Sequence, residues 1–381
     1  MKTLLPILSI LTHLLAFNFT IAQTTVISDT VFEQRLINLG YDSGPLDGSI
    51  PTSNIDTIKV LDISFDSIVD LTGIEDFISL EKLYCNNNRI TNLDFSSNTS
   101  LSYLNCSVNE LTSLIVTQNT LLQKLLCYNN LLNTLDVTQN INLVHFSCYN
   151  NLITSLDITQ NSNLNYLDCN RNDLISIDVT QNINLDSLIC HNNDITMLDL
   201  SQNSNLILLI CDHNQLTELD VSLNLLLRRI DCRYNLLTCV NVKNGNNLFF
   251  WNPYFQFNPN LTCIEVDNST YSTNNWSNHD PQTSFSTNCN NTCSTVDINE
   301  LQSPNINIFP NPTTRDISID LGETKTNLSA TLTNSLGQLI LIQKFESTDI
   351  INISIDAPSG VYILKLETTN GETINIKVLK E

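Results

Sequence analysis

The sequence predicts a mostly β chain, in which a solenoid of stacked parallel strands with little helix precedes a small antiparallel β-sandwich. The first observation is a strict repeat, since eight cysteines from Cys85 to Cys232 stand 21 residues apart. The second is the alternation of apolar and polar residues around each cysteine, which indicates a strand with one buried face. The third is a change after residue 303, where short alternating segments separated by Gly, Pro or Asn replace the repeat.

The overall composition and charge argue against one class of partner, the nucleic acids. The chain has 381 residues, only 15% of them charged, and a formal net charge of −22. Phosphate backbones repel so acidic a chain, and we therefore expect no nucleic-acid partner. The length is sufficient for two or three domains.

Residues 1–22 are typical of a signal peptide. Lys2 supplies the positive start, an interrupted apolar stretch follows, and Ala22 is a small residue placed for cleavage before Gln23. A membrane anchor is the alternative, which the polar interruptions disfavour. No later segment approaches the ~20 apolar residues of a spanning helix. We therefore expect export through the periplasm and no transmembrane segment in the mature chain.

The repeat occupies residues 80–247 as eight units of 21 residues. One unit reads Leu143-Val-His-Phe-Ser-Cys148-Tyr-Asn-Asn151-Leu-Ile153. This pattern resembles the leucine-rich repeat, LxxLxLxxNxL, with cysteine in place of the third leucine. A single unit cannot bury its own core, so the array needs neighbours and caps at both ends. The segment Val69–Glu75 resembles the first, divergent repeat of internalin-like proteins.

Two inward columns of the repeat have structural interpretations. One asparagine position is filled in every unit, and we expect these side chains to bond backbone groups of the turn and of the neighbouring coils. They are Asn88, Asn109, Asn130, Asn151, Asn172, Asn193, Asn214 and Asn235. The cysteine column is expected to behave as small buried apolar groups. A metal cluster does not suit its leucine-lined surroundings, and disulfides between neighbouring units are disfavoured by in-register side-chain directions.

The second half of each unit is too short for a helix. Leu135–Val137 and Leu198–Leu200 alternate as short strands do, so we expect strands on both sides of the solenoid. An acidic stripe there has two interpretations: calcium binding, or carboxylates that accept bonds from the following turn, which we favour. Its members are Asp94, Asp136, Asp157, Asp178, Asp199 and Asp220.

Residues 23–79 are assigned to the N-terminal cap and the divergent first repeat. Asp29 is placed to cap a helix over Thr30–Leu39, whose apolar side should cover the first coil. Strand pairing is expected to begin within Ser53–Ile63.

Residues 248–290 are assigned to the C-terminal cap, since the repeat pattern ends with the unit of Cys232. An aromatic cluster follows, interpreted as a hydrophobic plug over the last coil, with a ligand site as the alternative. It comprises Phe249, Phe250, Trp251, Tyr254 and Phe255. Cys263 and Cys289 are the best disulfide candidates in an exported protein, and the partners of Cys239 and Cys293 stay open.

Residues 291–302 are polar and aperiodic, which indicates a linker before the immunoglobulin-like β-sandwich of residues 303–381. This tail resembles the type A C-terminal sorting domain of the type IX secretion system. The matching positions are Pro310, Asn311, Pro312, Gly337, Gln338, Gly360, Val361 and Tyr362, together with a basic end at Lys380. The resemblance implies contact with that secretion machinery, removal of the tail, and either surface attachment or release. A ligand-binding immunoglobulin-like module is the alternative.

In leucine-rich-repeat proteins the outward side chains of the main strands, on the concave face, usually contact the ligand. Here this face varies between units and collects Tyr, His and Arg, and Tyr and Arg often dominate interface energies. Five basic against three acidic residues make it weakly positive, which suits a protein surface or an anionic glycan. The predicted ligand-binding residues are Lys82, Tyr84, Tyr103, Lys124, Tyr128, His145, Tyr149, Tyr166, Asp168, Arg171, His191, Asp212, His213, Arg229, Asp231, Arg233 and Tyr234. Sequence drift at solvent-facing positions is the alternative.

We predict no enzyme, no cofactor and no metal site. The chain lacks HExxH, GxSxG and phosphate-loop patterns. Asp168 and Asp212 are a carboxylate pair that could act on glycans, but they stand two repeats apart and are expected to be exposed. His191 and His213 are expected to be polar surface rather than metal ligands.

Two functional hypotheses remain. The first is a secreted or surface-attached protein that mediates adhesion or recognition through its concave sheet. The second is a structural surface-layer protein that binds copies of itself, for which an exposed Ile189, Leu208 and Ile210 patch is the expected contact.

Overall fold

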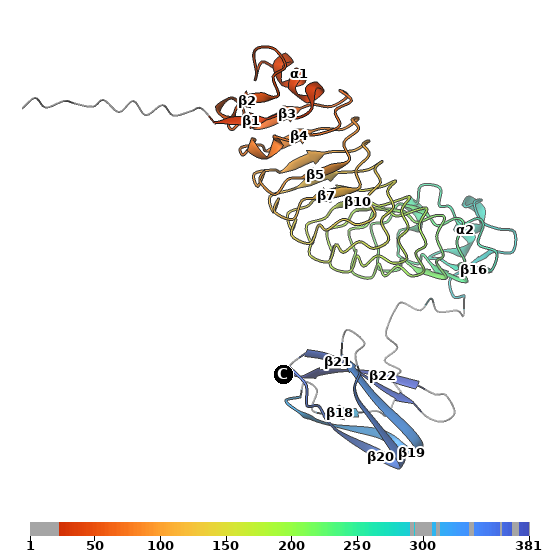
Figure 1. The fold of residues 1–381 in the computed structure, drawn as a ribbon. Coiled ribbons are helices and arrows are strands. Elements are labelled where there is room, and N and C mark those ends of the chain that lie inside the picture. The colour runs from red at the N-terminus through yellow and green to blue at the C-terminus, as the bar shows by residue number, and fades with distance from the viewer. Residues whose placement is uncertain are drawn as a thin grey trace, which may run out of the picture. The chain divides into compact units, whose positions relative to one another are not determined.

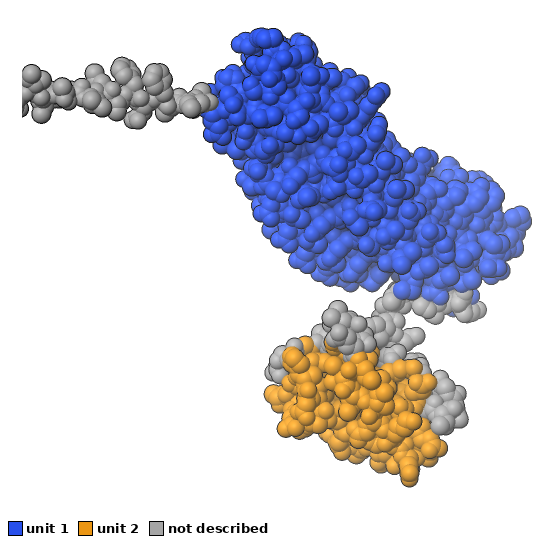
Figure 2. Space-filling model, in the orientation of Figure 1, with its two compact units in different colours: residues 1–293 blue, residues 294–381 orange. Residues whose placement is uncertain are grey.

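A computed structural model describes residues 23–289, 293, 307–309, 313–334, 339–358, 360–367 and 373–380. The chain divides into two compact units, residues 1–293 and residues 294–381 (Figure 2). The predicted signal peptide lies outside the described residues, and so does the predicted linker apart from Cys293. No helix in the described ranges is long and apolar enough to cross a membrane.

The first unit is a solenoid built on a nine-stranded parallel sheet, hereafter the long sheet (Figure 1). Each strand has three residues and comes from one coil of the chain. The strands are β3 (Val60–Asp62), β4 (Lys82–Tyr84), β6 (Tyr103–Asn105), β8 (Lys124–Leu126), β9 (His145–Ser147), β10 (Tyr166–Asp168), β11 (Ser187–Ile189), β12 (Leu208–Ile210) and β14 (Arg229–Asp231). Neighbouring strands pair without offset, as Tyr166 opposite Ser187 shows. The predicted leucine-rich-repeat solenoid is therefore confirmed.

The core of the solenoid follows from this register. The middle residue of each strand points inward and is fully buried, and so is the residue one place beyond each strand end, which is Ile63 after β3 and a cysteine after the other eight strands. Because equivalent residues stack at the ~4.8 Å strand spacing, leucine and cysteine form continuous columns. The eight ladder cysteines are buried free thiols, as predicted. Burial raises the pKa of every one of these thiols, which keeps them protonated and unreactive.

The predicted asparagine ladder joins neighbouring coils. The Nδ2 group of Asn172 donates to the carbonyl oxygens of Cys148 and Cys169, at 3.1 Å each, and its Oδ1 accepts from the Ile153 N–H at 3.0 Å. The same pattern recurs from Asn109 to Asn235. Each coil thus satisfies buried backbone groups of the coil before it.

A second asparagine ladder lies at the turn opposite the long sheet and was not anticipated from the sequence. Asn161 donates to the carbonyl oxygens of Val137 and Asn140, at 3.0 and 2.9 Å. The column comprises Asn98, Asn119, Asn140, Asn161, Asn182, Asn203 and Asn224, all essentially without solvent exposure.

The expectation of strands along the whole second side is wrong for the middle units. Pairing occurs near the ends only, between β5 (Asn92–Asp94) and β7 (Ser113–Ile115), and among β13 (Glu218–Asp220), β15 (Cys239–Asn241), β16 (Cys263–Glu265) and β17 (Ser284–Ser286). Leu135–Val137 and Leu198–Leu200 are not strands, although their leucines remain buried. Their buried leucines and the turn bonds accepted by Asp136 and Asp199 hold these segments.

The N-terminal cap matches the prediction in its main element. Helix α1 (Thr30–Asn38) begins after Asp29, and its Phe32 and Leu36 are buried over the first coil, whereas Val31 and Leu39 are exposed. Strands β1 (Thr24–Val26) and β2 (Ser49–Pro51) pair antiparallel beside it. Two 3₁₀ turns, η1 (Thr52–Asn54) and η2 (Ile74–Asp76), connect the cap to the repeats.

The C-terminal cap is fastened by two disulfides. Cys263 bonds Cys289, as predicted, and Cys239 bonds Cys293, which settles the open partners. Between them lie the 3₁₀ turn η3 (Asn247–Phe249) and helix α2 (Ser269–Asn275). Of the predicted plug, Phe250 and Phe255 are buried and contact Trp276, but Phe249 and Trp251 are exposed.

The second unit is a small antiparallel β domain with its own core, as predicted. Its strands are β18 (Asn307–Phe309), β19 (Asp316–Asn334), β20 (Leu339–Ser354), β21 (Gly360–Glu367) and β22 (Thr373–Lys380). They join in one hydrogen-bonded sheet, and the short segments expected at Ile317–Leu321 and Ala330–Thr333 are two ends of β19. A register shift between Asp320 and Lys325 separates those ends.

Replacing a ladder asparagine should weaken the solenoid far more than replacing an exposed one. Asn172→Ala leaves two buried carbonyls without this donor and the Ile153 N–H without its acceptor, so we expect a loss of about 2–4 kcal/mol in unfolding free energy. Asn163→Ala is the matched control, because its amide bonds the Ile141 carbonyl from an exposed position. Urea unfolding followed by circular dichroism measures both, and equal midpoints would contradict the role assigned to the ladder.

The Asp29 carboxylate should make stability depend on pH. Burial raises its pKa, but hydrogen bonds from the backbone N–H groups of Val69, Phe32, Val31 and Asp70 outweigh burial, and the pKa lies below its ordinary value of 3.8. A carboxyl with a depressed folded pKa stabilises the fold above its unfolded pKa, and this contribution is lost as pH falls through the folded pKa.

We therefore expect Asp29→Asn to lower the free energy of unfolding by about 1–2 kcal/mol at pH 7. This difference from the parent chain should disappear as pH drops below about 4. Denaturant unfolding at pH 7 and at steps down to pH 3 provides the measurement. Asp94→Asn, which alters an exposed turn carboxylate, is the control. A gap independent of pH would show that the charge of Asp29 does not matter.

Candidate functional site

The predicted ligand-binding residues all lie on the outer face of the long sheet or on the turn that follows it. The first and third residues of each strand point outward, and so does the residue two places beyond the strand end, such as Tyr128 or Arg233. The next residue, such as Arg171 or His213, forms the turn. These positions define four parallel columns that run along the solenoid.

Aromatic rings stack along these columns from coil to coil. The rings of Tyr128 and Tyr149 are parallel at 4.5 Å between centroids, and those of His145 and Tyr166 at 4.2 Å. Tyr84 contacts Tyr103 at 4.9 Å, and the ammonium of Lys124 lies 5.8 Å from the Tyr103 ring centre. Stacking between adjacent strands holds these side chains in fixed orientations.

The turn column has left-handed backbone at every coil. Positive φ values occur at Phe65, Asn87, Val108, Asn129, Asn150, Arg171, Asn192, His213, Tyr234 and Phe257. Asparagine tolerates this conformation, whereas Val108, Arg171 and the rings adopt it at a steric cost. At the C-terminal end the column is aromatic: His213 stacks on Tyr234 at 4.2 Å, and Tyr234 on Phe257 at 4.1 Å.

The acidic residues of the face are buried, contrary to the expectation that Asp168 and Asp212 are exposed. Asp168, Asp212 and Asp231 expose only 7%, 8% and 6% of their surface. Each carboxylate bonds a nearby side chain of its own coil. Asp168 accepts from the Asn170 amide, Asp212 accepts from His213 at 2.7 Å, and Asp231 forms a two-point pair with Arg233 at 2.9 and 2.7 Å.

Burial shifts the pKa of several groups in the middle of the face. Burial raises the pKa of Asp168, against the opposing hydrogen bonds from Asn170. Burial, with Asp168 nearby, raises the pKa of Tyr166 to about 12. Burial and then the charge of Lys124 lower the pKa of His145. Near neutral pH, Tyr166 and His145 therefore present neutral hydrogen-bonding groups rather than charges.

The face continues beyond the last coil recognised in the sequence, so the expectation that the array ends with the unit of Cys232 is wrong. Asn258 donates to the carbonyls of Cys232 and Phe255, at 3.1 and 2.8 Å, and so takes the ladder position. Phe255 takes the inward cysteine position, and Tyr254 bridges to Asp231 of β14. The steps from Asn235 to Asn258 and from Cys232 to Phe255 are 23 residues rather than 21. This longer step hid the additional coil, hereafter the added rung, from the sequence analysis.

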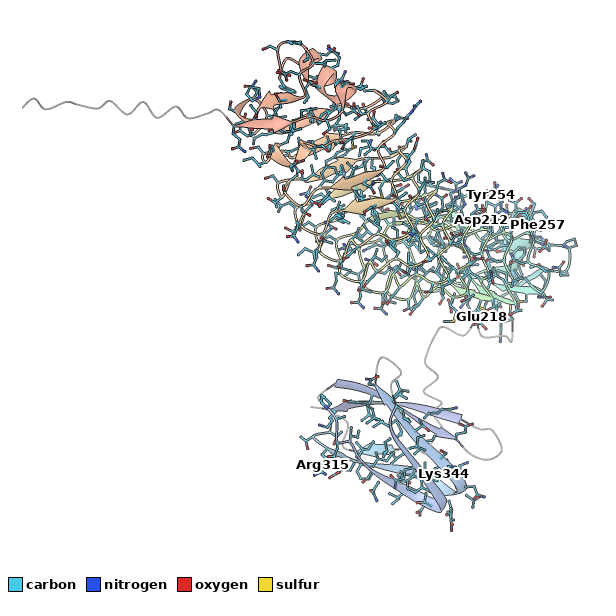
Figure 3. The ribbon with its side chains drawn as sticks, in the orientation of Figure 1. Asp212, Glu218, Tyr254, Phe257, Arg315 and Lys344 are labelled. Carbon is cyan, nitrogen blue, oxygen red and sulfur yellow. A yellow bond between two sulfur atoms is a disulfide. The ribbon has the colours of Figure 1, made fainter. Side chains whose placement is uncertain are left out.

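The added rung places further side chains at the site. The guanidinium carbon of Arg233 lies 4.7 Å from the centre of the Tyr254 ring, and Phe257 ends the aromatic turn column. Figure 3 shows Asp212, Tyr254 and Phe257 on one side of the solenoid and Glu218, on β13, on the opposite side. Tyr254, which the sequence assigned to the plug with a ligand site as the alternative, and Phe257, which it did not single out, thus lie on the candidate face.

The stripe of carboxylates on the opposite side follows the favoured interpretation. Asp136 accepts from the Thr138 N–H and hydroxyl at 2.9 and 2.7 Å, and Asp157 and Asp178 repeat this geometry. Within the described ranges, no group of three or more His, Cys, Asp or Glu residues is arranged to hold a metal ion.

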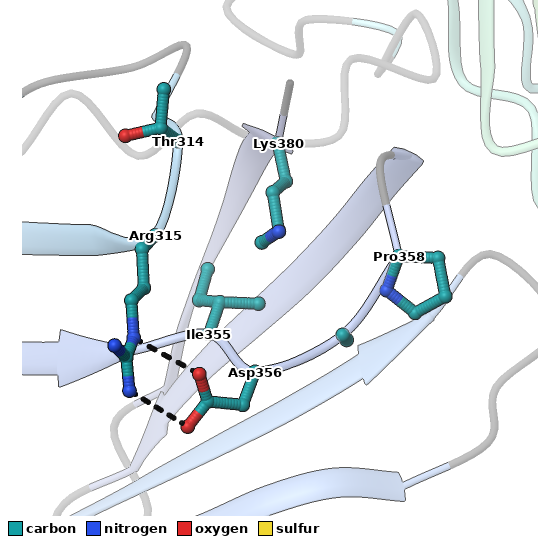
Figure 4. Close-up of a pocket in the computed structure, with 7 residues that line it drawn as sticks. Thr314, Arg315, Ile355, Asp356, Pro358 and Lys380 are labelled. Carbon is teal, nitrogen blue, oxygen red and sulfur yellow. Dashed lines mark hydrogen bonds and ion pairs between the residues drawn. The ribbon is translucent and has the colours of Figure 1, made fainter.

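The second unit contains an open pocket lined by charged residues (Figure 4). Arg315 pairs with Asp356 at 3.0 Å, and Lys380 lies across the pocket. Of the motif residues, Tyr362 is buried and its hydroxyl donates to the Pro358 carbonyl at 2.6 Å, while Gly360 and Val361 begin β21. Pro310, Asn311, Pro312, Gly337 and Gln338 lie outside the described residues.

Replacing Arg233 should destabilise the solenoid because it leaves the buried Asp231 carboxylate without its partner. We expect Arg233→Ala to cost about 1–3 kcal/mol of unfolding free energy, after allowing for the partial exposure of the arginine. Arg229→Ala is the control, because this exposed arginine has no recorded ion pair among the described residues. Urea unfolding at pH 7 compares the two, and an unchanged Arg233→Ala midpoint would contradict the pairing.

Comparison with known proteins adds one specific finding, which concerns the tail. Residues 307–381 match a family model described as a secretion system C-terminal sorting domain. The match confirms the predicted sorting tail of the type IX system and indicates export to the cell surface or the medium. No curated protein matches the chain in sequence.

Solved structures with similar architecture are distant. The functional domain of InlJ from Listeria monocytogenes, described as including a cysteine ladder, is 23% identical with a TM-score of 0.46, over 94% of this chain and 99% of that one. The leucine-rich-repeat protein LIC12759 of Leptospira interrogans is 21% identical with a TM-score of 0.49, over 62% of each chain. Internalin C2 of Listeria monocytogenes is 25% identical with a TM-score of 0.42, over 53% and 93%.

At these scores the structural similarities carry no argument about function, and the repeat assignment rests on the 21-residue coils themselves. The chain is an exported leucine-rich-repeat solenoid that carries a secretion-system C-terminal sorting domain.

Proposed function

We propose that this protein is an adhesion or recognition protein that binds a protein or glycan ligand through the outer face of the long sheet. The observation that carries the proposal is the set of stacked rings on neighbouring strands, interspersed with lysine and arginine. Rings held in place before binding lose little conformational entropy when a ligand is bound. Tyrosine and arginine are also the side chains that most often dominate binding energy.

The contrast between the two sides of the solenoid supports this choice of face. The opposite turns repeat Asp, Thr, Gln and Asn in unit after unit, and their side chains bond their own turns. The outer face of the long sheet changes at every unit. A scaffold whose variable positions share one rigid surface is typical of recognition proteins.

The proposal includes no catalytic step. The one carboxylate pair considered for glycan hydrolysis, Asp168 and Asp212, belongs to β10 and to the coil of β12, two coils apart. Both are buried and occupied, Asp168 by Asn170 and Asp212 by His213. This arrangement favours a structural role for the two carboxylates.

A screen of glycan and surface-protein arrays with the chain from residue 23 to 381 tests the proposal. One variant, Tyr128→Ala/Tyr149→Ala/Arg171→Ala, alters the middle of the face, and another, Arg229→Ala/Tyr234→Ala, alters its C-terminal end. Arg233 is left intact because its loss should also weaken the fold. We expect at least one variant to lose binding by tenfold or more, about 1.4 kcal/mol.

The matched control is Gln139→Ala/Gln160→Ala, which changes exposed amides on the opposite turns. Unfolding midpoints equal to that of the parent chain would show that lost binding is not lost folding. Binding that survives both face variants and disappears in the control would place the ligand elsewhere and refute the proposal.

Self-association into a surface layer is the second candidate function. The contact patch expected from the sequence is replaced by a different one in the structure. Ile189, Leu208 and Ile210 are half-buried, not exposed. Exposed leucines gather instead near the C-terminal end, at Leu223, Leu225, Leu226 and Leu248. Concentration-dependent assembly in light scattering, together with no array binding, would favour this candidate.

A further inference from the structure

The last cysteine-bearing unit departs from the repeat just before its strand. Where one earlier unit reads Asn140-Ile-Asn-Leu143-Val-His145, this unit reads Asn224-Leu-Leu-Leu227-Arg-Arg229. Arg228 and Arg229 are the only two adjacent basic residues in the chain. The backbone departs little, because the Arg228 and Arg229 N–H groups both donate to the Ile207 carbonyl as the repeat requires. The change is therefore one of surface chemistry.

This arginine pair is not neutralised locally. Both side chains are exposed, and neither has a recorded ion pair within the residues that the structure describes. The nearest acidic side chains are engaged, Asp231 by Arg233 and Asp212 by His213. Two free positive charges attract an anion to this point of a chain whose net charge is −22.

Two exposed aromatic rings border the arginines. The Trp251 N–H donates to the Arg228 carbonyl at 2.7 Å, which places Trp251 on the next rung beside Arg228. The guanidinium carbon of Arg228 lies 5.8 Å from the centre of the Phe249 ring. Trp251 is 60% exposed and Phe249 57%. Unlike Tyr234, whose ring has a stacked neighbour on each side, Trp251 has no recorded ring partner among the described residues.

The chemistry of these groups favours a carbohydrate over a peptide. An open indole face can pack against the C–H face of a sugar ring, and guanidinium groups pair with carboxylate or sulfate oxygens in two-point geometry. Asn252, the next residue after Trp251, bonds both the Tyr254 hydroxyl and the Asn278 amide. A peptide strand would need a free sheet edge, but Tyr254 already bridges to β14 at this end of the long sheet.

We propose that Arg228, Arg229 and Trp251 form a binding site for an anionic polysaccharide at the C-terminal end of the solenoid. The two guanidinium groups hold carboxylate or sulfate groups, and Trp251 carries the intervening sugar ring. The inference rests on the proposed recognition function and assigns its ligand class and location.

Binding of polygalacturonate and of heparin to the chain from residue 23 to 381 tests the site, with dextran as the neutral polymer and poly-glutamate as the acidic peptide. Titration calorimetry at low salt measures affinity. We expect Arg228→Gln/Arg229→Gln to weaken binding of at least one anionic polysaccharide tenfold or more, and Trp251→Ala to do the same. Added salt should weaken binding by the parent chain.

The charge-matched control is Arg89→Gln/Lys344→Gln, which removes two exposed positive charges that lie outside the proposed binding face. The ring control is Phe309→Ala, an exposed ring on β18 of the second unit. Both should stay within twofold of the parent. Unfolding midpoints confirm that all variants fold.

Three outcomes would overturn the site. No binding of either anionic polysaccharide would do so, and so would binding that survives Arg228→Gln/Arg229→Gln. Poly-glutamate binding of equal strength that Trp251→Ala leaves unchanged would indicate an acidic protein partner instead. A ligand lost with the middle-face variant but retained by the arginine variant would preserve the recognition function and reject only this site.

Discussion

The hydrogen bonds that each ladder asparagine makes to the preceding coil are the interaction on which the solenoid depends. Asn172 bonds backbone groups of its own coil and of the coil before it, so no coil has its buried polar groups satisfied in isolation. In the opposite ladder, the Asn161 side chain donates to two carbonyl groups of the coil before it. A coil at either end would therefore have unsatisfied groups and an uncovered core, which is why the array needs structured caps.

The caps solve this problem in different ways. At the N-terminus a single carboxylate, Asp29, accepts hydrogen bonds from the start of helix α1 and from Val69 and Asp70 of the first coil. At the C-terminus Asn258 continues the ladder for one more rung, with Phe255 in the cysteine position. Two disulfides then hold this end, and such cross-links suit an exported protein.

The in-register pairing of the strands also determines how side chains are arranged on the outer surface. Because strands pair without offset, side chains at equivalent positions stand one strand spacing apart, a distance at which aromatic rings stack. The buried ladders thus determine which outer side chains become neighbours. Uncompensated charge is concentrated where the repeat is broken, at Arg228 and Arg229, beside the exposed Trp251. The proposed polysaccharide site lies at this break.

The sequence by itself determined the repeat period, the inward leucine, cysteine and asparagine columns, the outward columns and the sorting tail. These features depend on local spacing, and a 21-residue step fixes which side chains share a column. Tertiary structure decided what depends on neighbours. Asp168, Asp212 and Asp231 are buried and bond side chains of their own coils, namely Asn170, His213 and Arg233, and Leu135–Val137 pairs with no neighbouring strand. A 23-residue step concealed the rung of Tyr254 and Phe257, and the Cys239–Cys293 bond depends on where the chain returns after the cap.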